Sequence, residues 1–395
     1  MKCKRLFLLF ALAGIMAGCK GVESNTIPTS IPEQTATPIP TCTLAPTAAV
    51  TPTSTPTPTP EPTFTPTPTP SPTPELLDIT ICFAGDVSLA DGAVTTKQWN
   101  NSGQELDKCI SPELLDRMNA ADVMCVNNEF TFSTRGEPME GKAYTFRANP
   151  ERVSLLWEMG VDLALLANNH VYDYGKDAIL DTFDTLTNAG IAYFGAGHNL
   201  KEVMKPYYVE LDGITIAFVA ASRAEKYKMT PQATETEPGI LRCYDTELFL
   251  EVIKEADANA DIVLACVHWG TEYSTVLEEA QLTTGKLYLD AGADAIIGSH
   301  SHCLQGMEFY DGKPIIYSLG NFWFNHRSLD TMLLEVHITG ERDNPQIDVV
   351  VIPALQENYK TTILIEQAEK QELYEYLESI SVNVEIDEYG IVREK

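Results

Sequence analysis

The sequence predicts an α/β protein built as a four-layer α/β/β/α sandwich. Apolar strand-like runs alternate with helical patterns through the middle of the chain, which is typical of a largely parallel sheet. An Asp212-Gly213 turn sits between two alternating runs, and residues 331–339 and 346–352 alternate like an antiparallel pair. These later features indicate a second, mixed sheet packed on the first.

Residues 1–19 have the pattern of a bacterial export signal. Basic residues precede the apolar run 6–15, which is too short for an ordinary membrane-spanning helix. Met16-Ala17-Gly18-Cys19 resembles a lipobox, in which Cys19 is lipidated and becomes the mature N-terminus. The alternative is a cleaved signal with an incidental cysteine. We expect a lipid anchor that holds the chain on the extracytoplasmic face of the bacterial cell membrane.

Residues 20–75 form a Thr/Pro-rich linker that we expect to be disordered. Proline fixes φ and removes a backbone donor, so the segment favours an extended, polyproline-like conformation. At about 3.1 Å per residue such a tether could reach about 150 Å. The globular domain is therefore expected to span residues 76–395.

The charge balance excludes one class of partner. The chain carries 27 Lys and Arg against 56 Asp and Glu, a formal net charge of -29. Nucleic-acid phosphates would be repelled by such a protein. The nine cysteines show no spacing that indicates a disulfide framework or a zinc site.

The expected elements follow from periodicity and punctuation. Asn149 is a candidate helix cap and Gly160 a candidate helix end, and residues 91–110 and 223–243 are polar and irregular. We expect strands at residues 78–84, 121–126, 161–166, 191–194, 206–221 (a hairpin), 262–267, 295–297, 315–317, 331–339 and 346–352. We expect helices at residues 112–119, 150–159, 176–189, 246–258, 278–291 and 365–380.

Five apolar runs end in side chains that can bind a metal. These side chains are Asp86, Glu129, Asn169 followed by His170, His268, and the pair His300 and His302. Open α/β sheets place their sites at the C-terminal ends of strands, so the residues are expected to converge. The bland alternatives are helix caps for Asp86 and Asn169, a core histidine for His268 and surface histidines for the pair.

The mixture of oxygen and nitrogen donors suits one or two Mn²⁺, Fe²⁺ or Zn²⁺ ions better than Ca²⁺. Glu129 is the candidate for a carboxylate that bridges two ions, and a metal pair generates hydroxide near neutral pH. His170 lies beside a ligand and could protonate a leaving group as the catalytic acid.

Several motifs together resemble the CapA family, which is linked to poly-γ-glutamate capsule synthesis. The resemblance covers roughly residues 78–330, and the family is similar in turn to calcineurin-like metallophosphoesterases. The motifs are Gly85-Asp86-Val87, Ala167-Asn168-Asn169-His170 with Asp173-Tyr174-Gly175, His268-Trp269-Gly270 with Glu272-Tyr273, residues 298–302, and Tyr317-Ser318-Leu319-Gly320-Asn321-Phe322.

The resemblance implies that Asp86 and His302 serve one metal, while Asn169, His268 and His300 serve the other and Glu129 bridges. Two departures stand out. The metallophosphoesterase pattern has a histidine where this chain has Ser88, and its bridging residue is usually an aspartate.

Two functions are open at this stage. One is a metal-dependent hydrolase acting on an anionic envelope polymer or a phosphoester. The other is a non-catalytic polymer-binding, export or anchoring factor that keeps the fold. Either reading allows capsule-synthesis membrane proteins as partners.

Overall fold

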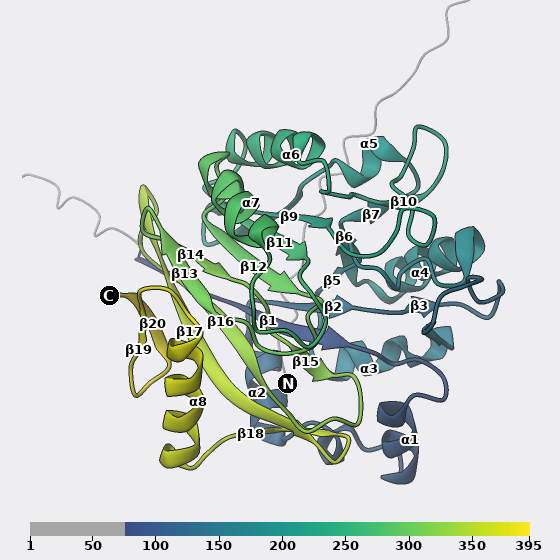
Figure 1. Cartoon of the computed structure of the whole chain (residues 1–395), viewed down its shortest axis with the longest axis horizontal. Coiled ribbons are helices and arrows are strands. Elements are labelled where there is room, and N and C mark those ends of the chain that lie inside the picture. Colours follow the sequence, from purple (N-terminus) through teal and green to yellow (C-terminus); the bar gives the residue numbers. More distant parts are fainter. Residues whose placement is uncertain (1–75) are drawn as a thin grey trace, which may run out of the picture. The chain divides into compact units, whose positions relative to one another are not determined.

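Two β-sheets lie face to face at the centre of the protein, with helices on both outer sides (Figure 1). This computed structural model describes residues 76–395. The predicted signal with Cys19 and the predicted linker 20–75 lie outside the described residues. The predicted four-layer α/β/β/α sandwich is confirmed.

The first sheet has ten strands in the order β19-β20-β17-β16-β1-β2-β5-β6, with β15 beside β1 and β18 beside β17. Strands β1, β2, β5, β6 and β15 are parallel, and the others pair antiparallel. The strands are β1 (Leu76–Val87), β2 (Val123–Asn128), β5 (Leu163–Leu165), β6 (Ala192–Phe194), β15 (Asn321–Trp323), β16 (Leu329–Glu341), β17 (Asn344–Glu357), β18 (Lys360–Ile363), β19 (Val384–Ile386) and β20 (Ile391–Glu394).

The second sheet has six strands in the order β13-β14-β12-β11-β9-β8, and its four central strands are parallel. The predicted Asp212-Gly213 hairpin is confirmed as β8 and β9 at one edge. The strands are β8 (Tyr207–Leu211), β9 (Ile214–Ser222), β11 (Ile262–His268), β12 (Ala295–Ser299), β13 (Met307–Tyr310) and β14 (Lys313–Ile316). Two short pairs lie outside both sheets: β3 (Thr131–Phe132) with β4 (Arg147–Ala148), and β7 (Ala196–Gly197) with β10 (Gly239–Ile240).

The helices cover the outer faces. The α-helices are α1 (Val94–Asn101), α2 (Pro112–Ala120), α3 (Val153–Glu158), α4 (Gly175–Ala189), α5 (Leu200–Val203), α6 (Glu247–Asp257), α7 (Glu279–Asp290) and α8 (Gln367–Ser379), and two 3-10 turns are η1 (Leu106–Lys108) and η2 (Pro150–Arg152). Buried side chains of α2, α3 and α4 share one apolar cluster with the outer face of the first sheet. Those of α6 and α7 do the same on the second sheet.

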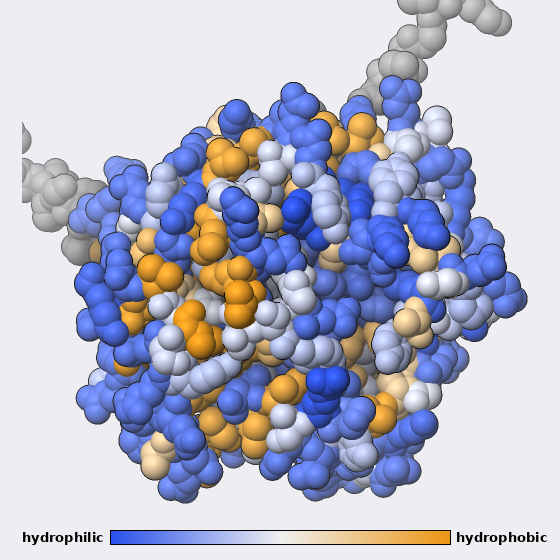
Figure 2. All heavy atoms as spheres, in the orientation of Figure 1, coloured by the Kyte–Doolittle hydropathy of each residue, from blue (hydrophilic) through white to orange (hydrophobic). Residues whose placement is uncertain are grey.

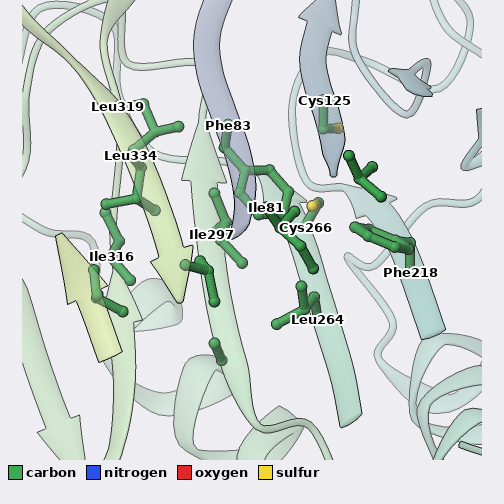
Figure 3. Packing of buried hydrophobic residues seen from close by; sticks show 14 of the residues in the cluster. Ile81, Phe83, Cys125, Phe218, Leu264, Cys266, Ile297, Ile316, Leu319 and Leu334 are labelled. Carbon is green, nitrogen blue, oxygen red and sulfur yellow. The ribbon is translucent and has the colours of Figure 1, made fainter. Parts of the chain in front are cut away.

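The main core lies between the sheets (Figure 3). Alternate residues of each strand enter it, so Ile81 and Phe83 of β1 face inward while Cys82 and Ala84 join the outer cluster. A fully buried side chain of this size contributes about 1.5–3 kcal/mol through removal from water. The core therefore fixes the register of the strands whose ends carry the predicted ligands.

Two expectations from the sequence are wrong. The antiparallel tail does not extend the second sheet, because β16 pairs along β1 from Leu76 to Ala84 in the first sheet. The segment 91–110 is not irregular throughout, since it contains α1 and η1. The hydroxyls of Thr95 and Thr96 donate to the carbonyls of Ser88 and Ala90, which anchors this polar helix to the end of β1.

None of the helices between residues 76 and 395 combines the length and the apolarity that crossing a bilayer requires.

Candidate metal centre

All six predicted ligands meet at the C-terminal ends of the parallel strands. Asp86 lies near the end of β1, Glu129 directly follows β2, and Asn169 lies in the loop after β5. His268 ends β11 in the facing sheet, and His300 and His302 follow β12. Side chains from both sheets therefore converge at one edge of the sandwich, as the sequence predicts.

The first group of donors contains Glu129, His268 and His300, whose candidate ligand atoms all lie within 4.8 Å of one another. Asn169 joins it, because its Oδ1 lies 2.8 Å from His268 Nε2. His268 Nε2 is also 3.8 Å from Glu129 Oε1. The hydroxyl of Ser299 lies 2.9 Å from His268 Nδ1, which orients the ring so that Nε2 faces the group.

The second group contains Asp86, Glu129 and His302, again within 4.8 Å. His302 Nδ1 lies 2.9 Å from Asp86 Oδ2, and His302 Nε2 lies 3.9 Å from Glu129 Oε1. The amide of Asn127 donates to Asp86 Oδ1 at 2.7 Å and to Glu129 Oε2 at 3.1 Å. Glu129 belongs to both groups, which is the position expected of a bridging carboxylate.

The turn that carries the two histidines has an unusual backbone. His300 has φ of 95° and His302 has φ of 56°, a region that L-residues other than glycine rarely adopt. Such conformations cost about 1–3 kcal/mol each and cluster at functional sites. Gly298, just before the turn, packs so closely that a Cβ would lie 1.9 Å from the Tyr317 carbonyl oxygen.

The protonation states suit ligands. Burial lowers the pKa of His268 well below its ordinary value, and the neighbouring His300 lowers it further. Burial likewise lowers the pKa of His300 to about 3. Both rings are therefore neutral near pH 7, which is the form that binds metals.

The carboxylates behave differently from each other. Burial alone would raise the pKa of Asp86, but hydrogen bonding to His302 and Asn127 holds it below the usual range. Burial, together with the charge of Asp86, raises the pKa of Glu129 well above its usual value. Glu129 thus lacks a positive partner among the described residues that would stabilise its ionised form.

A divalent ion fits this donor set. Glu129 Oε1 and His300 Nδ1 are buried and find no hydrogen-bond partner among residues 76–395. A buried polar atom without a partner costs about 1–3 kcal/mol. A cation between Glu129 and the imidazoles would satisfy both atoms and offset the carboxylate charge.

His170 lies beside the two groups. Its Nδ1 is 2.7 Å from Asp173 Oδ2, and its Nε2 is 3.9 Å from Glu129 Oε1. Lys142 is buried and its Nζ lies 2.7 Å from Asp173 Oδ1. The same ammonium donates to the carbonyl of Asn169. Burial lowers the pKa of His170, although Asp173 opposes the shift.

Aromatic rings form one wall of the site. The Phe146 ring lies 4.4 Å from the His170 ring, and the Phe324 ring lies 4.6 Å from the His302 ring, measured between centroids. The ring of Tyr273 lies 5.6 Å from that of His302 and carries the guanidinium of Arg327 over its face at 3.7 Å. The wall restricts water while a cationic group stands at its outer rim.

The sequence reasoning missed several residues of this site. It gave no role to Lys142, Asn127 or Phe146, and it treated Asn321 only as part of a motif. The signal for Asn127 was its place two residues before Glu129 at a strand end. Lys142 carried no signal, because it lies in an irregular connection whose burial is a tertiary effect.

The family of bacterial capsule synthesis proteins described as PGA_cap has a model that matches residues 80–326. The PGA biosynthesis protein CapA of Bacillus subtilis (strain 168) is 32% identical over 240 residues, which cover 58% of this chain and 62% of that protein. The capsule biosynthesis protein CapA of Bacillus anthracis is 35% identical over 212 residues, covering 52% of this chain and 50% of that protein. The chain thus matches less than two thirds of the length of these relatives.

Solved structures with a similar course of chain include a hypothetical protein from Thermus thermophilus, with 17% identity, a TM-score of 0.42, and coverage of 71% of this chain and 99% of that one. A 5'-nucleotidase from Candida albicans SC5314 has 12% identity, a TM-score of 0.40, and coverage of 69% and 51%. The family match extends over more than half of the chain and includes every predicted ligand. The chain therefore belongs to the PGA_cap family of bacterial capsule synthesis proteins.

Proposed function

We propose that this chain acts in the synthesis of an anionic envelope polymer such as poly-γ-glutamate and carries a metal-dependent hydrolase-like site. Family membership and the names of the two CapA relatives support the process. The observation that carries the chemistry is the unpartnered Glu129 Oε1, which faces the nitrogens of His268, His302 and His170 at 3.8–3.9 Å. The donors suit one or two Mn²⁺, Fe²⁺ or Zn²⁺ ions.

When bound, such ions would supply a Lewis acid that polarises the bond to be cleaved and generates hydroxide near neutral pH. Glu129 would be shared between the two ions, with Asp86 and His302 on one side. Asn169, His268 and His300 would hold the other.

His170 is the proposed acid. Asp173 accepts the Nδ1 hydrogen, so Nε2 is the atom that faces the centre and carries the exchangeable proton. The lowered pKa makes protonated His170 a ready proton donor to a leaving group. Phe146 packs against the same ring and limits its rotation.

The proposed location is the extracytoplasmic face of the cell membrane, with a lipid on Cys19. Support for this comes only from the lipobox-like sequence and the linker composition. An anionic polymer or a phosphoester is the proposed substrate, and membrane proteins of capsule synthesis are the proposed partners.

A second function is favoured by one observation. Position 88 holds a buried serine whose hydroxyl has no hydrogen-bond partner among the described residues, in place of the histidine typical of metallophosphoesterases. A weakened metal site is compatible with a non-catalytic factor that binds, exports or anchors the polymer.

Elemental analysis of the purified full chain tests the proposal. We expect one or two transition ions per chain in the wild type and a loss of at least one ion in His300→Ala. His198→Ala is the matched control, because His198 is an exposed histidine paired with Glu202 at 2.7 Å. No bound metal in the wild type, after anaerobic loading with Mn²⁺, Fe²⁺ or Zn²⁺, would contradict the hydrolase-like site.

Hydrolysis assays then separate the two functions. Poly-γ-glutamate and phosphodiesters are offered to the metal-loaded wild type and to His170→Asn. For a hydrolase, His170→Asn should keep its metal and lose about 10²- to 10⁴-fold in rate. Metal binding without cleavage of either substrate class, combined with binding of the polymer, would favour the non-catalytic factor.

A further inference from the structure

Asn321 places an oxygen donor inside the site next to Asp86. It begins β15, and it pairs in register with Asp86 at the end of β1. Its side chain is fully buried, and its Oδ1 lies 2.9 Å from His302 Nδ1. Asp86 Oδ2 lies at the same distance, 2.9 Å, from the same nitrogen. Two oxygen acceptors therefore converge on one ring nitrogen.

A single hydrogen cannot satisfy both acceptors well. An imidazole carries at most one hydrogen on Nδ1, whether the ring is neutral or protonated. The nitrogen of the Asn321 amide is buried and has no hydrogen-bond partner among residues 76–395. The local arrangement is therefore richer in acceptors than in donors, which is the condition that a bound cation relieves.

The spacing matches the coordination shell of a small divalent ion. Ligand atoms that each lie about 2.1 Å from a metal, at right angles to one another, are about 3.0 Å apart. The two 2.9 Å separations at His302 Nδ1 agree with this value. The hydroxyl of Ser88, the residue that stands where a histidine ligand is expected, makes no hydrogen bond among the described residues that would explain its burial.

We propose that Asn321 Oδ1 is a metal ligand that completes, with Asp86, Glu129 and His302, the subsite that lacks a histidine at position 88. The inference rests on the proposed function, since it requires that the site binds divalent metal. Each of the two subsites then has four protein ligands, with Glu129 shared.

The two subsites differ in chemical character as a consequence. The Asn321 subsite offers three oxygens and one nitrogen, whereas the other offers two imidazole nitrogens with two oxygens. Oxygen donors favour Mn²⁺ or Mg²⁺, and imidazole favours Zn²⁺ and Fe²⁺. The Asn321 subsite should therefore prefer Mn²⁺ to Zn²⁺, and it should exchange its ion more readily.

Manganese titration of the full chain tests this assignment, read by elemental analysis after gel filtration and by electron paramagnetic resonance of the spin-coupled pair. We expect two ions in the wild type and one in Asn321→Leu, with loss of the coupled signal and a rise of at least tenfold in the second dissociation constant. Asn321→Asp, which keeps the oxygen, should retain two ions. The ion that remains in Asn321→Leu also shows that the variant is folded.

Two controls remove the simpler explanations. Asn344→Ala changes an exposed asparagine at the start of β17 and should bind two ions. Ser88→Ala tests the competing ligand and should also bind two ions. Loss of the second ion in Ser88→Ala, with two ions kept in Asn321→Leu, would assign the ligand to Ser88 and overturn the proposal.

The remaining outcomes separate this inference from the proposed function. A wild type without metal overturns both. Two ions bound with unchanged affinity in Asn321→Leu overturns only the role of Asn321. A crystal of the manganese-loaded protein decides between a ligand and a mere hydrogen-bond partner of His302. Oδ1 within about 2.3 Å of an ion confirms the ligand, and a distance beyond about 2.6 Å rejects it.

Discussion

Lys142 is a buried cation that joins the proposed acid to the proposed ligands. Its side chain is 4% exposed, it pairs with Asp173 at 2.7 Å, and it donates to the carbonyl of Asn169. Asp173 is fully buried and also accepts from the backbone N–H of Phe146 at 2.6 Å. One ammonium therefore balances the carboxylate that orients His170 and fixes the loop that carries Asn169.

Replacement of this cation should be costly. In Lys142→Met, Asp173 remains buried without its charged partner, and breaking a buried pair in this way typically costs about 3–5 kcal/mol. We expect the free energy of unfolding, measured by urea denaturation monitored by circular dichroism, to fall by about 3 kcal/mol. Lys176→Met is the matched control, because Lys176 pairs with Glu237 on the surface at 2.6 Å and should change stability by less than about 1 kcal/mol. Equal small effects of the two substitutions would contradict this account.

At the scale of the element, β12 shows how strand packing places the histidine turn. It lies between β11 and β14, and Gly298 near its end faces the Tyr317 carbonyl, which also accepts from the Trp269 indole at 3.0 Å. A Cβ at Gly298 would lie 1.9 Å from that carbonyl oxygen and 2.8 Å from the indole nitrogen. Glycine is thus needed for close packing, and the strand end cannot move without moving His300.

Gly298→Ala should therefore lower both stability and metal content. Overpacking of a core costs about 1–3 kcal/mol, and we expect about 2–3 kcal/mol here because the clash is with backbone. Gly285→Ala in α7 is the control, since its nearest atom is the flexible Ile315 Cδ1 at 3.3 Å and alanine favours the helix. Thermal unfolding and elemental analysis of both variants provide the measurement. A fully metal-loaded, stable Gly298→Ala protein would show that the turn is not positioned by this packing.

On β16, Glu335 and His337 form a pH-sensitive contact with α2. His337 Nε2 lies 3.0 Å from Glu335 Oε2, and Arg117 donates to Glu335 Oε1 at 2.8 Å. The hydrogen bond to Glu335 raises the pKa of His337. Burial alone would raise the pKa of Glu335, but its bonds to His337 and Arg117 hold it below the usual range.

The sign of the pH effect follows from these shifts. The contribution of His337 is complete below its unfolded pKa of about 6.5 and is lost as the pH rises through the higher folded value. The contribution of Glu335 is present above about pH 4.5 and is lost in more acidic solution. His337→Gln should thus destabilise the protein by about 0.5 kcal/mol near pH 5.5 and by less at about pH 9. Urea unfolding at the two pH values measures this, and a larger effect in the alkaline solution would refute it.

At the scale of the whole molecule, periodicity and strand-end chemistry predicted the layers and the six converging ligands. Each ligand follows an apolar run, and the parallel arrangement then brings such ends together. Periodicity does not specify the partner of a strand, so the pairing of β16 with β1 was wrongly assigned to the other sheet. Lys142 and Asn321 were missed for a related reason, because their burial and their contacts arise only from long-range packing.

The charge of the whole chain yields a further prediction for polymer binding. A formal net charge of -29 repels poly-γ-glutamate, and the face of the described domain drawn in Figure 2 is largely hydrophilic. Attraction must then come from the metal centre, at short range. Salt screens long-range repulsion over about 10 Å at about 0.1 M but weakens a partly buried contact much less.

The apparent affinity for fluorescent poly-γ-glutamate, measured by anisotropy with Mn²⁺ present, should therefore rise between about 20 and 150 mM NaCl. This trend is opposite to that of a basic protein on a polyanion, whose affinity falls with salt as counterions are released. Chelation of the metal or His300→Ala should abolish binding at every salt concentration, while the exposed-histidine variant His198→Ala should bind as the wild type does. A steep loss of affinity with salt would instead indicate a basic polymer groove, and metal-independent binding would separate polymer recognition from the metal centre.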